Sequence, residues 1–299
     1  MNLKEIKRHK DIYILMFIPI IYFIIFKYVP MLNGQIAFKD FKPRLGVWGS
    51  PWAGLRFFKE FFSSYYFWEL IRNTVGYSFG KLILSVPLSI ILAVVLFESH
   101  RETLRKIVQT LTYLPHFLSW VIMYGILLSL LAPGDGVIND LVKMCGGEPI
   151  DFLTNTKCFP WIVLFSDAWK EMGWGAIIFI AALMGIYPSL YEAAMVEGTT
   201  ALQRTWYITI PSIRPVIVMV VLLKLGTILN AGFNQIFMLY NTSVLSVADI
   251  IDTWVYRQGL LDARFSLATA VGIFKGIIGT LLVAFANRLT KVVADSSLF

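Results

Sequence analysis

Charged residues are scarce in this sequence. They make up 15% of its 299 positions, whereas hydrophobic residues make up 57%, and the mean hydropathy is +0.69. A soluble globular protein needs more polar surface than this composition supplies. The sequence therefore predicts an integral membrane protein that contacts the lipid bilayer along much of its length.

The charges that are present do not form a patch. The chain has 26 Lys and Arg against 19 Asp and Glu, but the cations are scattered between apolar segments. A nucleic-acid-binding domain would gather its cations along one face, whereas scattered cations are normal beside membrane-spanning segments. We therefore expect no nucleic-acid partner.

Motifs of common catalytic and metal sites are also missing. The chain contains no Gly-x-x-x-x-Gly-Lys-Ser/Thr phosphate loop, no His-Glu-x-x-His motif and no Cys-x-x-Cys pair. Its three histidines, His9, His100 and His116, are far apart in the sequence, and we interpret His116 as a structural hydrogen-bonding residue. We expect no catalytic residue, metal ligand or cofactor on this chain.

Cysteine is rare as well, since the chain has only Cys145 and Cys158. Both lie in the segment 132–160, between two long apolar runs. We expect this segment to lie outside the cell, where a disulfide could form. Two cysteines carry no information about their pairing, so a disulfide and two free thiols both stay open.

Long apolar runs are what the sequence has in abundance. About 20 helical residues cover the hydrocarbon layer of a bilayer, and six segments reach that length: 12–32, 74–97, 111–131, 161–185, 215–240 and 267–289. The first has no small-residue cleavage site, which favours a retained helix over a cleaved signal. The sequence predicts a single all-α transmembrane domain over 1–299.

An even number of spans places both termini on the same face of the membrane. Cations close to the first span favour the cytoplasmic side, and the stretch 1–10 carries Lys4, Lys7, Arg8 and Lys10. We therefore expect both termini in the cytoplasm. The segment 33–68 then lies outside, and its many aromatic residues indicate either an interfacial belt or a docking face for an extracellular partner.

Charged residues inside the expected spans are candidates for a transport path. A charge in hydrocarbon is costly unless it faces a bundle interior or a wet cavity. Asp167, Lys170 and Glu171 lie within about one turn of the fourth span, and Asp167 and Lys170 have the i, i+3 spacing of an ion pair. A self-neutralising structural cluster and a role in the path both stay open.

The last two expected spans carry further polar residues near their middle, namely Lys224 and Lys275. Asn230 and Asn234 are one helical turn apart on the fifth span, with Gln235 beside them, so a continuous helix would give them a polar stripe. Interhelical hydrogen bonding would explain such a stripe, and so would a lining for a hydroxyl-rich solute. Sugars stack on aromatic rings, and the aromatic candidates nearby are Trp169, Trp174, Phe233 and Phe237.

The loop 186–211, between the fourth and fifth spans, has the pattern of two short capped helices. Ser189 with Glu192, and Thr200 with Gln203, have the spacing of a capping box. Gly198 lies between them, where it can end the first helix in the left-handed conformation. A helical pair outside the bilayer is suited to bind a partner.

The same loop resembles a family signature. Glu192-Ala193-Ala194, three residues, Gly198, nine residues and Ile208-Thr209-Ile210-Pro211 is similar to the Glu-Ala-Ala-x3-Gly-x9-Ile-x-Leu-Pro loop of permease subunits of binding-protein-dependent ABC importers. The spacing matches throughout, and Ile210 in place of Leu conserves volume. Seven further stretches resemble the maltose-type oligosaccharide permeases of Gram-positive bacteria, in the polysaccharide or aldouronate group: 26–30, 37–41, 72–74, 113–120, 169–174, 230–235 and 240–241.

This resemblance implies the type I ABC importer permease fold, with six transmembrane helices and a cytoplasmic coupling-helix loop, in a multi-pass protein of the bacterial plasma membrane. It implies that the loop couples to a separate ATPase through Glu192, Ala193, Ala194, Gly198, Ile208 and Pro211. The implied partners are a second homologous permease subunit, two cytoplasmic ABC ATPase subunits that bind ATP and Mg²⁺, an extracellular solute-binding lipoprotein and an oligosaccharide substrate. Hydrolysis of ATP then belongs to the partners, so this chain is not itself an enzyme, and a homodimer and a heterodimer both stay open.

Three other functions remain as alternatives. In an ion- or proton-coupled secondary transporter, Asp167, Glu171, Lys224 and Lys275 would form the relay. An ABC permease for a non-sugar solute is the second alternative, and a membrane scaffold or sensor without transport is the third. Neither the secondary transporter nor the scaffold explains a capped helical pair in the loop.

Overall fold

The computed structural model describes residues 10–99 and 101–294, and helices form most of this part of the chain. The described residues contain no strand beyond one isolated bridge between Lys39 and Trp52. The predicted all-α class is therefore confirmed. The chain divides into two compact units, Met1–Phe67 with Val255–Lys275 and Trp68–Trp254 with Gly276–Phe299.

The first unit begins with one long apolar helical segment. Its elements are α2 (Lys10–Phe23), η1 (Ile24–Tyr28), α3 (Val29–Met31), η2 (Leu32–Phe38), α4 (Gly46–Gly49), α5 (Arg56–Phe62), η7 (Arg257–Leu261) and the start of α17 (Phe265–Ala294). Ser266 Oγ on α17 donates to Lys39 O at 2.6 Å and accepts from Phe41 N at 3.0 Å. Arg264 pairs with Glu60. These contacts fasten the segment after η2 to the start of α17.

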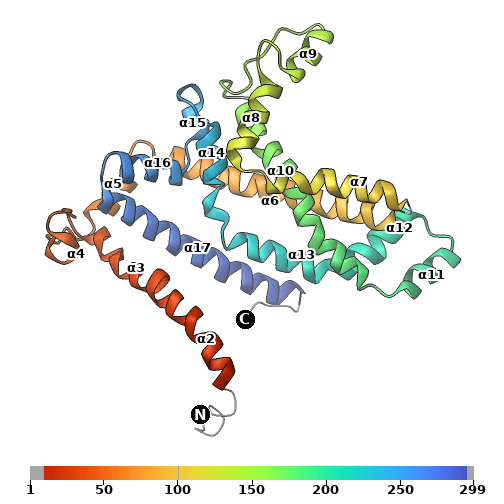
Figure 1. Cartoon of the computed structure of the whole chain (residues 1–299), viewed down its shortest axis with the longest axis horizontal. Coiled ribbons are helices and arrows are strands. Elements are labelled where there is room, and N and C mark those ends of the chain that lie inside the picture. The colour runs from red at the N-terminus through yellow and green to blue at the C-terminus, as the bar shows by residue number, and fades with distance from the viewer. Residues whose placement is uncertain (1–9, 100, 295–299) are drawn as a thin grey trace. The chain divides into compact units, whose positions relative to one another are not determined.

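The second unit holds the remaining helices (Figure 1). They are α6 (Phe67–Glu98), α7 (Glu102–Tyr113), η3 (Leu114–Phe117), α8 (Trp120–Leu131), α9 (Val137–Met144), α10 (Phe159–Met184), α11 (Pro188–Val196), α12 (Ala201–Arg204), η4 (Thr205–Thr209), α13 (Ile210–Leu225), η5 (Ile228–Asn230), α14 (Phe233–Leu239), η6 (Thr242–Val244), α15 (Leu245–Ala248), α16 (Ile251–Tyr256) and the end of α17. Helix α10 contacts α7, α13 and α14, so it is central to this unit.

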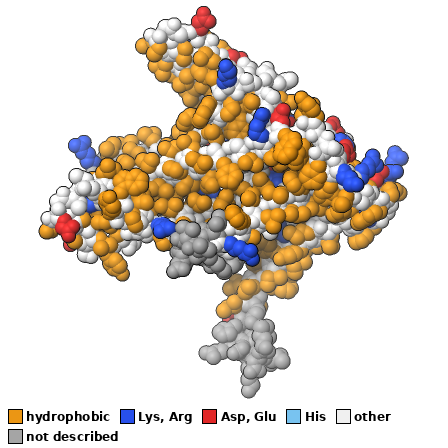
Figure 2. Space-filling model, turned by 180° about the vertical axis from the view of Figure 1, so that it is seen from behind, with side chains coloured by type: hydrophobic (Ala, Val, Ile, Leu, Met, Phe, Trp, Pro, Cys, Tyr) orange, Lys and Arg blue, Asp and Glu red, His pale blue; other side chains and the backbone are white. Residues whose placement is uncertain are grey.

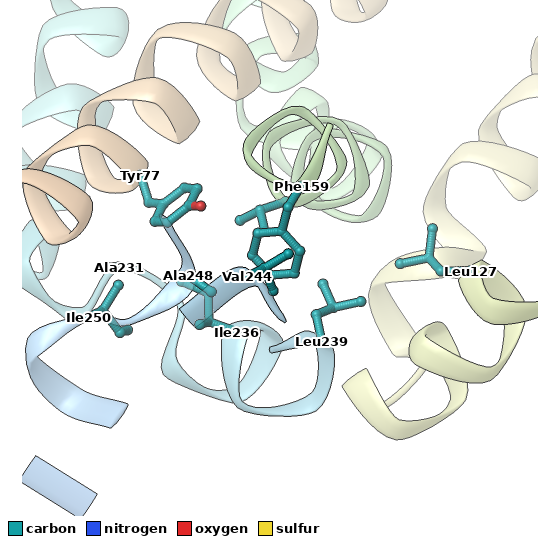
Figure 3. Packing of buried hydrophobic residues seen from close by; sticks show 10 residues of the cluster. Tyr77, Leu127, Phe159, Ala231, Ile236, Leu239, Val244, Ala248 and Ile250 are labelled. Atoms are coloured by element: carbon teal, nitrogen blue, oxygen red, sulfur yellow. The ribbon is translucent and has the colours of Figure 1, made fainter. Parts of the chain in front are cut away.

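Two apolar clusters hold the second unit together. In the cluster of Figure 3, Tyr77 of α6 and Phe159 of α10 lie with Ile236 and Leu239 of α14. The other cluster joins α6, α10 and α13 through Val86, Ala93, Val94, Ala176, Phe179, Leu183 and Ile213. Close packing of this kind is a main source of helix association in a membrane, where lipid is as apolar as the side chains.

Four helical segments are long and apolar enough to cross a membrane, and the number rises to six if each of two bent helix pairs is one span. Three of the four agree with the predicted spans 12–32, 74–97 and 267–289: Ile14–Phe38, Phe67–Glu98 and Phe265–Arg288. Figure 2 shows hydrophobic side chains over most of the visible face, with few charges among them. This surface is what a lipid-embedded protein requires.

The third predicted span, 111–131, is not one straight helix. The helical segments Glu102–Phe117 and Trp120–Leu131 meet at an angle of 112°. Leu118 is extended, and Ser119 caps α8 by accepting a hydrogen bond from Ile122 N at 3.3 Å. Pro115, which lacks a backbone N–H, fits the short 3₁₀ turn before the corner.

The prediction of one continuous span over 215–240 is wrong. Helix α13 ends at Leu225, and the span itself is Ala201–Leu225. Ala231 (φ 47°) and Gly232 (φ 80°) are both left-handed and separate η5 from α14. Asn230 and Asn234 therefore do not form a stripe on one helix.

The two cysteines are free thiols, with Cys145 exposed and Cys158 half-buried. In this structure, therefore, the two cysteines do not form a disulfide. Asn139, fully buried, orders the loop between them by bonding to both backbone groups of Ile150, donating to Ile150 O and accepting from Ile150 N at 2.8 Å.

Candidate functional site

A polar pocket of about 260 Å³ lies where the chain breaks between α13 and α14. Its walls come from α6, α10, the end of α13 and the turn around η5. Asp167, Glu171, Lys224 and Asn230, all predicted from the sequence, line it. The pocket is thus formed at a point where helical hydrogen bonding is interrupted.

Lys81 on α6 binds groups on α10, at the break and on α14. Its ammonium group pairs with Asp167 Oδ1 at 3.2 Å, donates to Ala231 O at 2.9 Å and donates to Gln235 Oε1. Ser78, one turn earlier on α6, donates to Ile228 O. The cation therefore satisfies the carbonyl of Ala231 at the break, and the hydroxyl adds a second hydrogen bond to Ile228 O, which also accepts from Ala231 N within η5.

Lys81 was not among the residues predicted from the sequence. The signal was present, since Lys81 falls inside the predicted span 74–97 and a cation at that depth is a functional candidate by the criterion applied to Lys224. Gln235, by contrast, was a candidate for the solute path but is fully buried, where its amide donates to Val163 O at 2.7 Å and Ser166 Oγ at 2.8 Å. The contacts of Gln235 are those of a helix-to-helix connection.

The predicted cluster on α10 does not neutralise itself. Asp167 pairs with Lys81 rather than with Lys170. Lys170 is buried and donates to three backbone carbonyls, Pro115 O at 3.0 Å, His116 O at 2.7 Å and Leu118 O at 2.6 Å. Lys170 therefore secures the corner between α7 and α8, and Asp167 secures α6.

Glu171 connects the polar pocket to the same corner. Its Oε2 lies 3.1 Å from His116 Nδ1, and the His116 ring stacks on Trp174 with centroids 4.5 Å apart. The interpretation of His116 as a hydrogen-bonding residue agrees with this geometry. Trp174, a predicted sugar-stacking residue, has one ring face covered by His116.

The other sequence candidates lie elsewhere. Trp169 lines a separate apolar pocket of about 490 Å³, together with Trp161 and Phe165. Phe233 stacks on Phe237 with ring centroids 5.2 Å apart. Asn234 is exposed, Lys275 belongs to the first unit, and neither lines the polar pocket. Their proposed contact with solute stays a prediction.

The loop 186–211 contains a short helix, α11, with a well-defined end. Gly198 is left-handed (φ 76°), its N–H donates to Met195 O at 3.0 Å, and Thr199 N–H donates to Ala194 O at 3.1 Å. This is the Schellman arrangement that ends helices at glycine, and it confirms the expected role of Gly198 in the backbone.

One of the two predicted capping boxes is present. At Thr200 and Gln203 both reciprocal hydrogen bonds form, as predicted. The box at Ser189 and Glu192 is wrong, because α11 begins at Pro188 with Tyr187 as its N-cap and no side-chain cap. Proline is favoured at the first helical position, so it places Ser189 inside the first turn. Glu192 is exposed and does not cap its own helix.

Contacts within the second unit fix α11 and α12 in place. Tyr191 Oη lies 3.0 Å from Thr209 Oγ1, and Arg204 donates to Thr199 O at 2.8 Å. Thr205 donates to Glu98 at the end of α6 at 3.1 Å. The loop is therefore cross-linked internally and attached to the end of α6.

The predicted coupling residues differ in exposure. Glu192, Ala193, Gly198 and Pro211 are exposed, Ile208 is half-buried and Ala194 is buried. Large apolar side chains are exposed beside them, among them Leu190, Met195, Val196, Leu202, Trp206 and Tyr207. An exposed apolar surface of this kind indicates an interface. Among the described residues, no group of three His, Cys, Asp or Glu side chains could hold a metal ion.

This chain is similar in sequence, over nearly its whole length, to two proteins of Bacillus subtilis. "Protein LplB" of Bacillus subtilis is 40% identical over 294 residues, which cover 98% of this chain and 92% of that protein. "Polygalacturonan/rhamnogalacturonan transport system permease protein YteP" of the same organism is 41% identical over 292 residues, covering 98% and 91%.

Solved structures agree with the sequence relatives. A chain of a bacterial ABC transporter involved in import of the acidic polysaccharide alginate superimposes with a TM-score of 0.90 at 39% identity, covering 97% of this chain and 98% of that one. A chain of the alginate ABC transporter in complex with an alginate pentasaccharide-bound periplasmic protein gives a TM-score of 0.91 at 38% identity, covering 99% of both chains.

The family model for the inner membrane component of binding-protein-dependent transport systems matches residues 85–296. That range contains the polar pocket's walls from α10 and α13, α11 and the Gly198 turn. This chain therefore belongs to the family of inner membrane components of binding-protein-dependent transport systems.

Proposed function

We propose that this chain forms part of the translocation path of an ATP-driven importer of oligosaccharides. Two relatives of nearly full-length similarity support the choice of solute, since one is named for polygalacturonan and rhamnogalacturonan and the other imports alginate. In this proposal, the sugar binds in the polar pocket beside the break between α13 and α14.

The observation that carries the proposal is the surface of α11. The helix exposes Glu192 and Ala193 of the family signature, and its end is fixed by Gly198. Tyr191 on α11 is hydrogen-bonded to Thr209, the N-cap of α13, and Thr205 of η4 is hydrogen-bonded to Glu98 at the end of α6. A partner that moves α11 would move these long helices with it. We infer that a cytoplasmic ATPase subunit binds here, and that ATP and Mg²⁺ bind to that partner.

We infer three kinds of partner for this chain. The alginate transporter binds a periplasmic protein loaded with a pentasaccharide, and we infer an extracellular solute-binding lipoprotein for this chain. We further infer two ATPase subunits and a second, homologous permease subunit. The long apolar segment Ile14–Phe38 supports a permease partner, since none of its most apolar stretch is buried within this chain. In this arrangement both termini are cytoplasmic.

The experiment places a charge on the exposed surface of α11. Val196 is 91% exposed, so Val196→Asp leaves the packing of this chain intact while it puts a carboxylate into the apolar contact with the ATPase. Loss of a central interface contact costs about 2 kcal/mol or more, so ATP-dependent oligosaccharide uptake by proteoliposomes of the assembled importer should fall by at least about tenfold.

Val137→Asp is the matched control, because Val137 is 56% exposed in the first turn of α9 and away from α11. It should leave uptake unchanged. Normal uptake by Val196→Asp would refute the ATPase contact. Uptake that continues without ATP but stops when ion gradients are collapsed would instead establish the secondary-transporter alternative.

A further inference from the structure

We propose that Lys224 binds the carboxylate of an acidic sugar unit in the polar pocket, so that the carried solute is a uronate-containing oligosaccharide. This inference rests on the proposed import function. It adds a specificity-determining residue and a chemical class of substrate to it.

Among the described residues that line the pocket, Lys224 is a cation without a carboxylate partner. Lys81 pairs with Asp167 at 3.2 Å, and Glu171 lies 3.1 Å from His116. Lys224 Nζ contacts the Ser85 hydroxyl at 3.5 Å, a long and neutral contact. Among the described residues, no carboxylate lies within salt-bridge distance (4.0 Å) of the Lys224 ammonium group. Lys224 is exposed within this chain, so its ammonium group is accessible to an anionic partner in the pocket.

The neighbours of Lys224 fit a sugar acid. Ser85 and Asn230 line the same pocket, and a hydroxyl and an amide can each bond to sugar hydroxyls. Lys224 itself can supply three donors to a carboxylate, in the stronger, charge-assisted form of hydrogen bond. Together these groups offer one cationic and two neutral positions to one ligand.

The opposite wall sets the orientation. Glu171 lines the pocket from α10 and, unlike Asp167, has no lysine or arginine partner among the described residues, so an added carboxylate is repelled from Glu171 and directed towards the end of α13. A cavity of about 260 Å³ lies just below the range of about 300–1,000 Å³ for drug-sized ligands. It therefore suits one sugar unit of a longer chain.

The test compares two forms of one sugar in proteoliposomes of the assembled importer with its binding protein. The probes are trigalacturonate and the same trisaccharide with its carboxyl groups methyl-esterified, which keeps the hydroxyls but removes the charges. Wild type should import the acid form. Lys224→Met should lower uptake of the acid by about tenfold or more, the value of one charge-assisted hydrogen bond, and change any uptake of the ester by less than about twofold. Lys224→Arg should retain most acid uptake.

Lys143→Met is the control for loss of a cation, because Lys143 lies on α9 and pairs with Asp140 outside the pocket. It should change neither uptake. The amount of assembled complex, measured for each variant, shows that Lys224→Met still folds.

An equal loss of both sugars in Lys224→Met, or no loss of either, would overturn the role of Lys224. ATP-driven import of neutral oligosaccharides alone would also overturn it, although the proposed sugar importer would stand. ATP-driven import of no sugar at all would remove both proposals.

Discussion

At the scale of single residues, the membrane-embedded charges of the second unit are distributed over three different tasks. Lys81 and Asp167 join α6 to α10, Lys170 secures the corner after η3, and Lys224 faces the polar pocket. The i, i+3 spacing predicted a pair between Asp167 and Lys170, but each binds a partner on another segment. Asp167 pairs with Lys81 on α6, and Lys170 donates to backbone carbonyls at the corner after η3. Spacing along one helix cannot show which neighbouring helix supplies a counter-charge.

The contribution of the Lys81–Asp167 ion pair to stability can be measured. Removing one partner of a buried ion pair costs about 3–5 kcal/mol, because the other charge is left without compensation. Lys81→Met should therefore destabilise the protein strongly, and Asp167→Asn in the same chain should restore part of the loss. A double-mutant cycle of thermal unfolding in detergent measures this coupling. Additive effects of the two substitutions would show that the ion pair contributes nothing.

At the scale of elements, the approach of α10 to α7 depends on a small residue. A Cβ atom on Gly173 would lie 2.0 Å from Thr112 O in the backbone of α7, so Gly173→Ala must push the two helices apart. Overpacking typically costs about 1–3 kcal/mol, which unfolding in detergent would detect. Because Lys170 holds the adjacent corner, uptake should fall as well.

Two other helical glycines provide the control. At Gly76 on α6 and Gly125 on α8, no atom beyond the chain neighbours and the nearby backbone of the same helix lies within 4 Å of the position that an alanine methyl group would occupy. Alanine also has the higher helix propensity, by about 1 kcal/mol. Substitution of either glycine by alanine should leave stability equal or higher. A loss of stability at Gly76 or Gly125 equal to that at Gly173 would show that close approach is not the cause.

Elements were predictable from the sequence where local chemistry determines them. The glycine-ended helix α11 and the capping box at Thr200 involve residues a few positions apart, and the signature residues lie in the same loop. The break after α13 is instead contacted from α6, where Lys81 binds the carbonyl of Ala231 and Ser78 binds that of Ile228. No pattern within 215–240 contains that information.

At the scale of the whole molecule, the orientation of the chain in the membrane remains a prediction. The native Cys145 is exposed in the loop after α8, which we place outside, whereas Val196 lies on α11, which we place inside. In a Cys158→Ser background, a membrane-impermeant maleimide should label Cys145 in intact cells. In a chain without the native cysteines, a cysteine introduced by Val196→Cys should react only after permeabilisation.

The reverse labelling pattern would place α11 outside the cell and exclude its contact with a cytoplasmic ATPase. Equal labelling before and after permeabilisation at both positions would indicate leaky cells, so a cytoplasmic enzyme is labelled in parallel. The same pair of sites therefore tests the orientation and one premise of the proposed function.

The pairing of Lys81 with Asp167 has an electrical consequence. Moving one elementary charge across a membrane potential of 100 mV takes about 2.3 kcal/mol, whereas a cation and an anion that move together carry no net charge. Since these two residues lie on α6 and α10 and form a contact of 3.2 Å, a joint movement of both helices does no net work against the field through this pair. The voltage across the membrane would then act on the charge of the solute and not on this ion pair.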